Sequence, residues 1–305
     1  MKQHTLNDKF SLTGKGLHTG LPLTLTFLPA PEHHGFKIQR MDLPGQPLID
    51  VLAENVIDTS RGTVVGTPDC RVSTIEHAMA ALVAFEVDNC LMQVDGPEFP
   101  ILDGSSILYV EQLQKVGIAE QEAERLYAEL TEPLEYYDEI SGSCLRFEPS
   151  THFSVDSTIE FPDSPFLQTQ RAVLTQLADF PREIASARTF VFVREIEPLL
   201  NMGLIKGGDL NNALVIYEQQ LSQERLNTLA DTLGVEHRDA SHLGYLQQKP
   251  ITWENEPARH KLLDILGDMA LIGRPLRGRI IAIRPGHKAN NKFARLVRTK
   301  LKLNS

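Results

Sequence analysis

A glycine-rich stretch at residues 14–20 (GKGLHTG) lies between two segments in which apolar and polar residues alternate. Alternation with a period of two is typical of β-strands, so we expect residues 10–28 to form a strand, a turn and a second strand. A dinucleotide-binding fingerprint would instead need a helix directly after the glycines, because the helix N-terminus binds the pyrophosphate. The alternating residues 21–27 (LPLTLTF) argue against such a helix, and the sequence excludes a Rossmann fold here.

Two helices are predicted from their end signals, one in each half of the chain. Residues 73–76 (STIE) have the capping-box pattern of a helix start with Ser73 as N-cap, and good helix formers follow. Residues 257–272 are predicted as a long helix, since Pro257 suits its first position and Gly273 the position just past its end. Further predictions are strands at 88–94 and 279–283, helices ending near Val116 and covering 221–233, and a loop at 284–291.

The order of the predicted elements indicates an α+β fold. Strands and helices come in blocks in both halves, and such blocks pack as sheets covered by helices. A chain of 305 residues is long enough for roughly two domains. The charged residues 120–125 (EQEAER) separate the two blocks. We therefore expect an N-terminal α+β domain over residues 1–126 and a C-terminal α+β domain over residues 127–305.

Charge and composition limit the classes of partner that this chain is expected to bind. It has 30 Lys and Arg residues against 40 Asp and Glu, a formal net charge of −10. This balance argues against a nucleic-acid partner but leaves room for a pocket that binds a few phosphates. No apolar run approaches the roughly 18 residues of a membrane span, so we expect no stable membrane insertion. The three cysteines, Cys70, Cys90 and Cys144, are far apart and odd in number, which indicates reduced thiols and a cytoplasmic protein.

His260 and Asp264 are spaced four residues apart on the long predicted helix. This spacing puts an imidazole and a carboxylate on one helix face about one turn apart, where they can chelate one cation. A surface ion pair has the same spacing, so both interpretations stay open. The helix is otherwise apolar on several sides, and polar groups among apolar ones need partners, which favours the metal.

Glu76 and His77 form the second candidate pair. Glu76 fits the third helical position of a capping box, and His77 fits a buried core histidine, so a purely structural role is open. The functional alternative makes His77 a third metal ligand and Glu76 a general base, as a catalytic zinc site requires. Asp268 lies one turn beyond the His260 pair, and His287 is predicted on a loop after a strand, where a carboxylate would make it a usable general acid. Both are also compatible with ordinary surface residues.

Taken together, these segments resemble the UDP-3-O-acyl-N-acetylglucosamine deacetylase family, the zinc amidases of bacterial lipid A synthesis. The resemblance covers nearly the whole chain and rests on seven motifs in the same order. They are residues 14–20 (GKGLHTG), 73–82 (STIEHAMAAL), 95–105 (DGPEFPILDGS), 186–190 (SARTF), 206–212 (KGGDLNN), 260–268 (HKLLDILGD) and 286–292 (GHKANNK).

The resemblance implies a fold and a metal site. The expected fold is a β-α-α-β sandwich, two domains that each layer helices against a sheet, with the active site between them. His77, His260 and Asp264 match the metal ligands of the family. Zn²⁺ is the expected ion, with Fe²⁺ as the alternative in the cell, because imidazole and carboxylate ligands accept both. Glu76 matches the general base that takes a proton from the attacking water.

The remaining site roles also come from the resemblance. His287, with Asp268 behind it, matches the group that protonates the leaving amine, and Thr189 matches the hydroxyl that stabilises the tetrahedral oxyanion. Three substrate-binding residues are expected as well. These are Lys261 at the phosphates, Phe190 near the sugar and His18 facing the nucleotide. An insert at about residues 192–217 matches the family's hydrophobic passage for the acyl chain, although its apolar pattern equally fits an element packed on the core.

The implied reaction is metal-dependent hydrolysis of the N-acetyl group of UDP-3-O-(3-hydroxyacyl)-N-acetylglucosamine, the committed step of lipid A biosynthesis. The substrate is the expected partner. We expect a monomer, or a chain fused to or associated with a hydroxyacyl-carrier-protein dehydratase, and Ser305 is compatible with either. Two alternatives stay open: a non-catalytic nucleotide-sugar binding protein on the same scaffold, and a metallohydrolase that acts on another amide.

Overall fold

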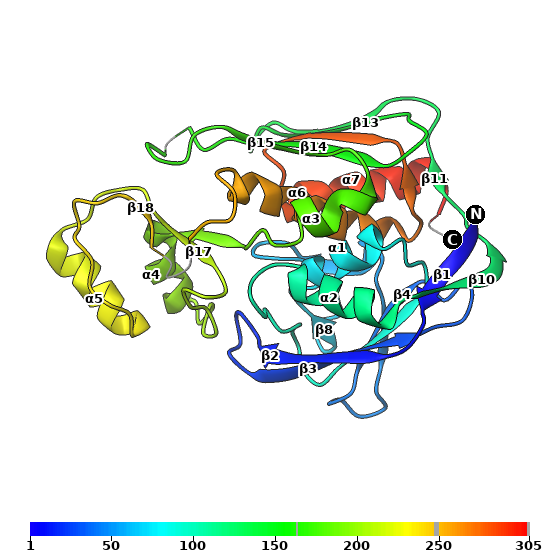
Figure 1. Ribbon diagram of the computed structural model, residues 1–305, viewed down its shortest axis with the longest axis horizontal. Coiled ribbons are helices and arrows are strands. Elements are labelled where there is room, and N and C mark those ends of the chain that lie inside the picture. The colour runs from blue at the N-terminus through cyan, green and yellow to red at the C-terminus, as the bar shows by residue number, and fades with distance from the viewer. Residues whose placement is uncertain (163, 247–249, 304–305) are drawn as a thin grey trace.

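The computed structural model describes residues 1–162, 164–246 and 250–303, and its sheets and helices lie in four layers (Figure 1). One five-stranded sheet forms each outer layer. The helices α1 (Glu76–Ala84) and α2 (Ile107–Val116) cover the first sheet, and α6 (Glu256–Met269) and α7 (His287–Lys300) cover the second. The predicted α+β class and β-α-α-β sandwich are therefore confirmed.

The first outer sheet has the strand order β2-β3-β9-β4-β5, antiparallel except for the parallel pair β4 and β9. Its strands are β2 (Phe10–Lys15), β3 (Pro22–Pro29), β4 (Phe36–Arg40), β5 (Leu48–Asp50) and β9 (Cys90–Val94). In β3, Leu25 and Phe27 are buried while Thr24 and Thr26 are partly exposed. The predicted strand, turn and strand around the glycine-rich stretch are confirmed.

The second outer sheet has the order β12-β13-β20-β14-β15, with the last strand of the chain in its centre. Its strands are β12 (Leu134–Asp138), β13 (Ser143–Glu148), β14 (Ser154–Ile159), β15 (Gln170–Leu174) and β20 (Arg279–Ile283). Strand β20 is antiparallel to β13 and parallel to β14. The predicted strand at 279–283 is confirmed.

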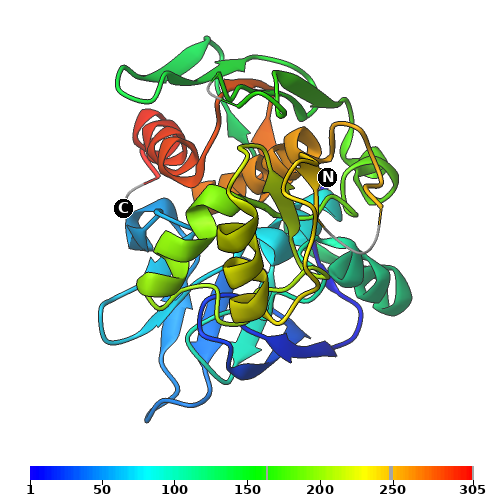
Figure 2. The same ribbon diagram turned by 90° about the vertical axis from the view of Figure 1, so that its left-hand side faces the viewer.

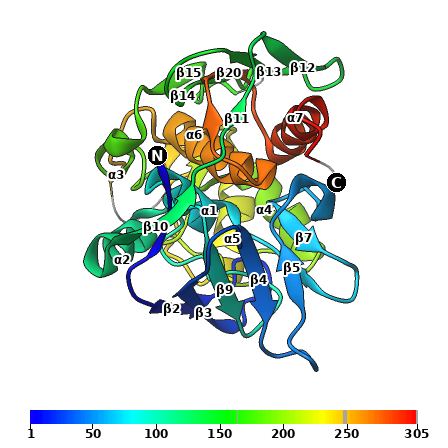
Figure 3. The same cartoon turned by 90° about the vertical axis from the view of Figure 1, so that its right-hand side faces the viewer.

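Two two-stranded sheets lie beside the layers. Strands β1 (Lys2–Leu6) and β10 (Ile118–Glu124) form an antiparallel pair, and β11 (Ala128–Glu129) and β19 (Leu276–Arg277) a parallel one. Figure 3 shows the chain passing from the first pair of layers to the second through β10 and β11. The charged residues at 120–125 therefore lie largely in a paired strand, and the domain boundary at 126/127 falls between these two strands and stays a prediction.

A separate unit projects from one end of the layers (Figures 1 and 2). It contains β16 (Phe190–Phe192), α4 (Val193–Asn201), β17 (Leu214–Tyr217), α5 (Gln223–Leu233) and β18 (Gly244–Tyr245). It has its own apolar cluster, which includes Ile196, Val215 and Leu226. This unit, hereafter the insert, contains the predicted segment 192–217 and the predicted helix at 221–233.

Other short elements complete the described chain. They are η1 (Ala53–Asn55), β6 (Val56–Asp58), β7 (Val64–Gly66), β8 (Arg71–Val72), η2 (Leu177–Asp179), α3 (Phe180–Glu183) and η3 (Ala270–Ile272). The predicted helix at 257–272 corresponds to α6 and η3, and Gly273 ends it with a left-handed φ of 76°. None of the helices in the described ranges has the length and apolar character needed to cross a membrane.

Two local predictions are wrong. Helix α1 begins at Glu76, with Ile75 rather than Ser73 as its N-cap and with no side-chain cap. Ser73 instead forms a bridge to Glu98, so a long-range contact replaces the local capping box. The predicted loop at 284–291 is also wrong, because α7 begins at His287. Its buried Ala289, Phe293, Ala294 and Val297 form an apolar stripe that packs on the core and stabilises the helix.

The inner helices α1 and α6 pack at very close range. A Cβ added to Gly267 of α6 would lie 2.1 Å from the backbone oxygen of Glu76 in α1. Around this contact, Ala78 and Leu82 of α1 and Leu263 and Leu266 of α6 are fully buried in one apolar core that reaches both outer sheets. The two halves of the chain therefore share a core, and Gly267 determines how closely they approach.

Replacing Gly267 by alanine tests this contact. We expect Gly267→Ala to lower the free energy of unfolding by about 1–3 kcal/mol, because the obstructing atom is backbone and one helix must shift. Urea denaturation followed by circular dichroism measures the change. Gly286→Ala is the matched control, since a Cβ there meets no heavy atom within 4 Å. We expect it to change stability by less than about 1 kcal/mol, and equal losses in both variants would contradict the packing argument.

Candidate active site

A cavity of about 220 Å³ lies where α1, α6 and α7 meet the insert. Every predicted site residue except Asp268 lines it, although these residues come from widely separated parts of the sequence. The lining members of that set are His18, Glu76, His77, Thr189, Phe190, His260, Lys261, Asp264 and His287. Asp268 lies behind His287 and is hydrogen-bonded to it.

His77, His260 and Asp264 form the centre of the site. One ligand atom from each lies within 4.8 Å of the others, and all three residues are buried. The two imidazole rings meet edge to face with centroids 4.9 Å apart, and His260 Nε2 lies 3.3 Å from Asp264 Oδ1. The i, i+4 spacing on α6 therefore serves a buried cluster with a third member on α1, and it is not a surface ion pair.

The chemistry of these side chains fits a divalent cation. His260 Nδ1 lies 3.0 Å from the carbonyl oxygen of Ala187, so this nitrogen donates and Nε2 is left as an acceptor. Asp264 Oδ1 is buried and has no hydrogen-bond partner in the described part of the chain. An orphaned carboxylate oxygen beside two imidazoles is the donor set of a metal site.

The protonation states agree with that interpretation. Burial, reinforced by the neighbouring His260, lowers the pKa of His77 to about 3, so the imidazole is neutral as a ligand must be. Burial alone would raise the pKa of Asp264, but Lys261 and the nearby histidines hold it below its usual range. Lys261 Nζ reaches Asp264 Oδ2 at 2.8 Å. The cluster therefore presents two neutral nitrogens and an ionised carboxylate.

Glu76 lies at the first position of α1 and is buried, with 4% of its surface exposed. Its Oε2 accepts a hydrogen bond from the backbone N–H of Thr63 at 3.1 Å. Burial, together with the carboxylates of Asp264 and Asp268, raises the pKa of Glu76 to about 7, despite the opposing effect of His287. A carboxylate with this pKa can both accept and release a proton near neutral pH.

His287 is partly buried and pairs with the buried Asp268. Its Nδ1 lies 3.0 Å from Asp268 Oδ2, while Nε2 faces the cavity at 3.9 Å from Glu76 Oε1 and 3.8 Å from Asp264 Oδ2. Burial alone would lower the pKa of His287, but the surrounding carboxylates, Asp268 first, raise it to about 9. The imidazolium form is therefore favoured at neutral pH, as a general acid requires.

Thr63 is a site residue that the sequence analysis missed. Besides its N–H bond to Glu76, its hydroxyl donates to Asp268 Oδ1 at 2.5 Å. Asn290 Nδ2 donates to the other Asp268 oxygen at 2.8 Å. Thr63 thus connects the groups on both sides of the cavity, and no spacing or motif signal in residues 60–65 points to this role.

The three predicted binding residues and Thr189 surround the central cluster. Phe190 lies beside His260, with ring centroids 6.5 Å apart, and Lys261 Nζ lies 5.4 Å from the Phe190 ring centroid. Thr189 precedes Phe190, and its backbone is anchored to Gly104 and Leu214. His18 enters from the glycine-rich loop, and neither of its buried ring nitrogens makes a hydrogen bond of ordinary geometry with the described residues.

The same cavity continues into the insert. Apolar side chains line that part of it. These are Ile196, Leu199, Ile205, Leu210, Val215, Leu233 and Val235. The polar cluster and the apolar wall therefore line the same cavity. Met202, which belongs to the same predicted segment, is exposed and does not line it. The hydrophobic passage for the acyl chain stays a prediction.

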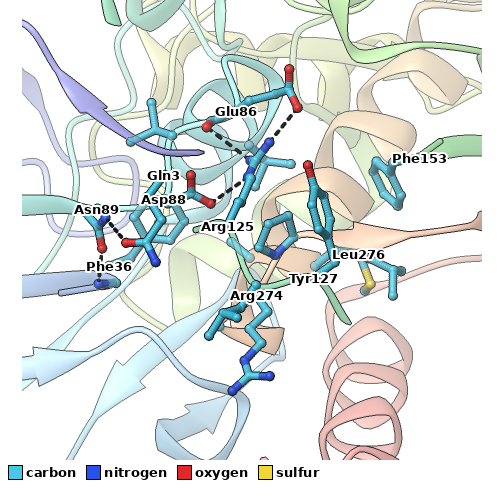
Figure 4. A pocket seen from close by; sticks show the side chains of 18 of the residues that line it. Gln3, Phe36, Glu86, Asp88, Asn89, Arg125, Tyr127, Phe153, Arg274 and Leu276 are labelled. Atoms are coloured by element: carbon cyan, nitrogen blue, oxygen red, sulfur yellow. Dashed lines mark hydrogen bonds and ion pairs between the residues drawn. The ribbon is translucent and has the colours of Figure 1, made fainter. Parts of the chain in front are cut away.

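A larger cavity of about 690 Å³ lies at the opposite ends of α1 and α6 (Figure 4). None of the predicted site residues lines it. Arg125 at its wall is buried and is paired with Glu86 at 2.6 Å and with Asp88 at 2.8 Å, so its charge is compensated. Size alone would select this cavity, but among the described residues the buried atoms of His18 and Asp264 without a hydrogen-bond partner line the smaller one.

Metal content tests the ligand assignment. We expect wild-type protein dialysed against Zn²⁺ to retain about one ion per chain, and His77→Ala and Asp264→Ala to lose it. Glu76→Ala is the control, because it removes a buried carboxylate next to the cluster without removing a ligand. Atomic absorption after dialysis gives the result. Loss of zinc in Glu76→Ala, or retention in both ligand variants, would contradict the assignment.

The chain was compared with known proteins. A family model described as UDP-3-O-acyl N-acetylglycosamine deacetylase matches residues 3–238 and 239–299. The chain is 56% identical over 303 residues to the Bifunctional enzyme LpxC/FabZ of Bacteroides thetaiotaomicron, covering 99% of this chain and 66% of that protein. The protein of the same name from Porphyromonas gingivalis is 57% identical, with 99% and 65% covered.

A third relative has a shorter chain. The UDP-3-O-acyl-N-acetylglucosamine deacetylase of Anaeromyxobacter sp. strain Fw109-5 is 40% identical over 299 residues, which cover 97% of this chain and 88% of the relative. This chain thus spans slightly less than two thirds of the two bifunctional relatives and most of this one. With the match of the family model over nearly all of its length, the chain belongs to the UDP-3-O-acyl N-acetylglycosamine deacetylase family.

Proposed function

We propose that this protein hydrolyses the N-acetyl group of UDP-3-O-(3-hydroxyacyl)-N-acetylglucosamine, giving the free amine and acetate in the committed step of lipid A biosynthesis. The observation that carries the proposal is the convergence, at one cavity, of a His/His/Asp cluster, a buried glutamate and a histidine that is paired with a buried aspartate. Membership of the family and the relatives' names agree with it.

His77, His260 and Asp264 would hold the metal, with Zn²⁺ as the proposed ion and Fe²⁺ as the alternative in the cell. When bound, the ion supplies Lewis acidity beside the acetyl carbonyl. The two histidines contribute neutral nitrogens, and Asp264 contributes charge through the oxygen that makes no hydrogen bond within the described residues. The hydrogen bond of His260 to Ala187 keeps its ring in the orientation that this role needs.

Glu76 is the proposed general base. Its carboxylate takes the proton from the water that attacks the acetyl carbonyl, and a pKa near 7 suits that transfer. The backbone N–H of Thr63 holds Oε2, which leaves Oε1 directed toward His287 and the cavity. Because Glu76 and His77 are adjacent at the start of α1, base and ligand are positioned together.

His287 is the proposed general acid. An amide nitrogen leaves as an amine only after it is protonated, and the His287 Nε2–H can supply that proton. Asp268 holds Nδ1 and favours the charged ring, while Thr63 and Asn290 orient Asp268. Thr189 is the proposed donor to the tetrahedral oxyanion.

Substrate binding is proposed for the rest of the cavity. Lys261, the only one of the three that is charged at neutral pH, would meet the phosphates, Phe190 the sugar and His18 the nucleotide. The apolar wall of the insert would hold the acyl chain. A cytoplasmic location, a monomeric state and fusion to a dehydratase stay predictions. The complete set of ligands, base and acid disfavours the non-catalytic binding protein, because such a protein has no use for all of them.

Acetate release tests the function. We expect metal-stripped protein to be inactive on the acylated UDP-N-acetylglucosamine, and stoichiometric Zn²⁺ to restore activity. Glu76→Ala, reloaded with zinc, should lose about 10²- to 10⁴-fold in kcat, since it lacks the base. An enzymatic acetate assay measures both. Absence of activity in the zinc-loaded wild type, or an unchanged rate in Glu76→Ala, would refute the proposed reaction or the proposed base, respectively.

Substitutions of Thr63 give a second test, because Thr63 contacts Asp268, the partner of the proposed general acid His287. We expect Thr63→Val to keep its metal but to lose about tenfold in kcat. The reason is that the Asp268 carboxylate loses the hydrogen bond from the Thr63 hydroxyl, and hydrogen bonds to charged groups are stronger than neutral ones. Thr63→Ser keeps the hydroxyl and should stay near the wild-type rate. Steady-state kinetics with a metal assay compare the two variants. Equal rates in valine and serine variants would show that the hydroxyl has no part in orienting Asp268.

A further inference from the structure

We propose that Glu98 is a positioning residue for substrate binding, which holds residues 16–20 of the glycine-rich loop so that His18 faces the cavity. This inference rests on the proposed function, because it assigns a task in binding the same nucleotide sugar. Glu98 itself does not line the cavity. Its influence therefore has to pass through the loop.

Glu98 is fully buried, and its carboxylate is satisfied by four donors. Oε1 accepts from the His18 N–H at 2.9 Å and from the Thr74 hydroxyl at 3.1 Å. Oε2 accepts from the N–H and the hydroxyl of Thr19 at 3.0 and 2.8 Å. A buried carboxylate is tolerated only when such donors replace water, so the donors cannot move away without a large cost.

The two segments joined by this carboxylate both lead into the site. The loop carries His18, whose ring nitrogens are buried without ordinary hydrogen bonds in the described chain. The turn carries Thr74, which has a φ of 59°, and runs directly into Glu76 and His77. A left-handed conformation is costly for a β-branched residue and persists where other contacts impose it. The Thr74 hydroxyl bond to Glu98 is such a contact.

The opposite side of the loop contacts the insert. The Gly207 N–H donates to the Leu17 carbonyl at 3.0 Å, and a Cβ on Gly207 would lie 2.1 Å from the Gly16 oxygen. A Cβ on Gly16 would lie 2.2 Å from Glu98 Oε2. The loop thus lies between the Glu98 carboxylate and the insert, and the close contacts leave no room for a side chain at Gly16 or Gly207.

The ring nitrogens of His18 indicate the purpose of this arrangement. Both are buried, and neither makes an ordinary hydrogen bond with the described residues, so a polar ligand beside them in the cavity would supply a partner. Loosening the loop should then weaken substrate binding, while Glu76, His287 and the ligand cluster keep their own contacts. This separates a positioning role from a catalytic one.

Glu98→Gln is the direct test, because it keeps the size of the side chain and replaces one acceptor oxygen by a donor group. We expect KM for the acylated UDP-N-acetylglucosamine to rise about tenfold or more, with kcat within about threefold and zinc content unchanged. Asp95→Asn is the matched control. Asp95 accepts the Thr24 N–H at 2.7 Å in the same segment, is exposed and lies outside the cavity, so its KM should stay at the wild-type value.

Thr19 provides a milder pair of variants in case Glu98→Gln does not fold. Thr19→Val removes one donor to Glu98 without changing the shape of the side chain, and Thr19→Ser restores it. We expect the valine variant to raise KM by about threefold or more and the serine variant to remain near wild type. Equal KM values in Thr19→Val and wild type would overturn the proposal.

A double-mutant cycle with His18→Ala identifies the route of the effect. If Glu98 acts through His18, adding Glu98→Gln to His18→Ala should change KM and the affinity for UDP, measured by calorimetry, by less than about twofold. Independent, multiplying effects would overturn the proposal, as would a fall in kcat with unchanged KM. A zinc-loaded wild type that binds UDP but releases no acetate would instead refute the proposed function.

Discussion

The candidate active site depends on the close approach of α1 and α6. Gly267 has no side chain, so the two helices come together where its Cα faces the Glu76 carbonyl. This approach puts His77 of α1 beside His260 and Asp264 of α6. The same contact joins the apolar cores of the two halves into one. Packing and site geometry therefore have a common cause, and a change that separates these helices disturbs both.

Charges buried at this junction need partners, and the partners determine their orientation. Glu76, Asp264, Asp268 and His287 lie next to an apolar core, where an unpaired charge is costly. Donors from distant segments hold Glu76 and Asp268, and Thr63 does so for both carboxylates at once. Asp264 is instead paired with Lys261 of its own helix. Glu98 follows the same rule at the edge of the cavity, with four donors. The hydrogen bonds that stabilise these buried charges therefore also hold the side chains in place before a substrate binds.

The sequence predictions were accurate where the deciding interaction is local and wrong where its partner is distant in the sequence. The ends of the helical segment formed by α6 and η3 were predicted from Pro257 and Gly273, because these residues act on their own backbone. The start of α1 was predicted wrongly, since Ser73 bonds to the segment around Glu98 instead of capping the helix. His287 was predicted on a loop, although packing of the α7 stripe extends the helix to it. Thr63 left no signal, because its partner Asp268 is remote in sequence.

By itself, the sequence determined the strand and helix periodicities, the His260–Asp264 spacing and, through seven motifs, the family and its candidate residues. Only the tertiary structure decided how closely His77 approaches this pair, that Thr63 contacts both Glu76 and Asp268, and that the glycine-rich loop lies between Glu98 and the insert. The physical reason is that periodicity and spacing act within one element. Burial and hydrogen bonding of charged groups depend instead on which distant elements the core brings into contact.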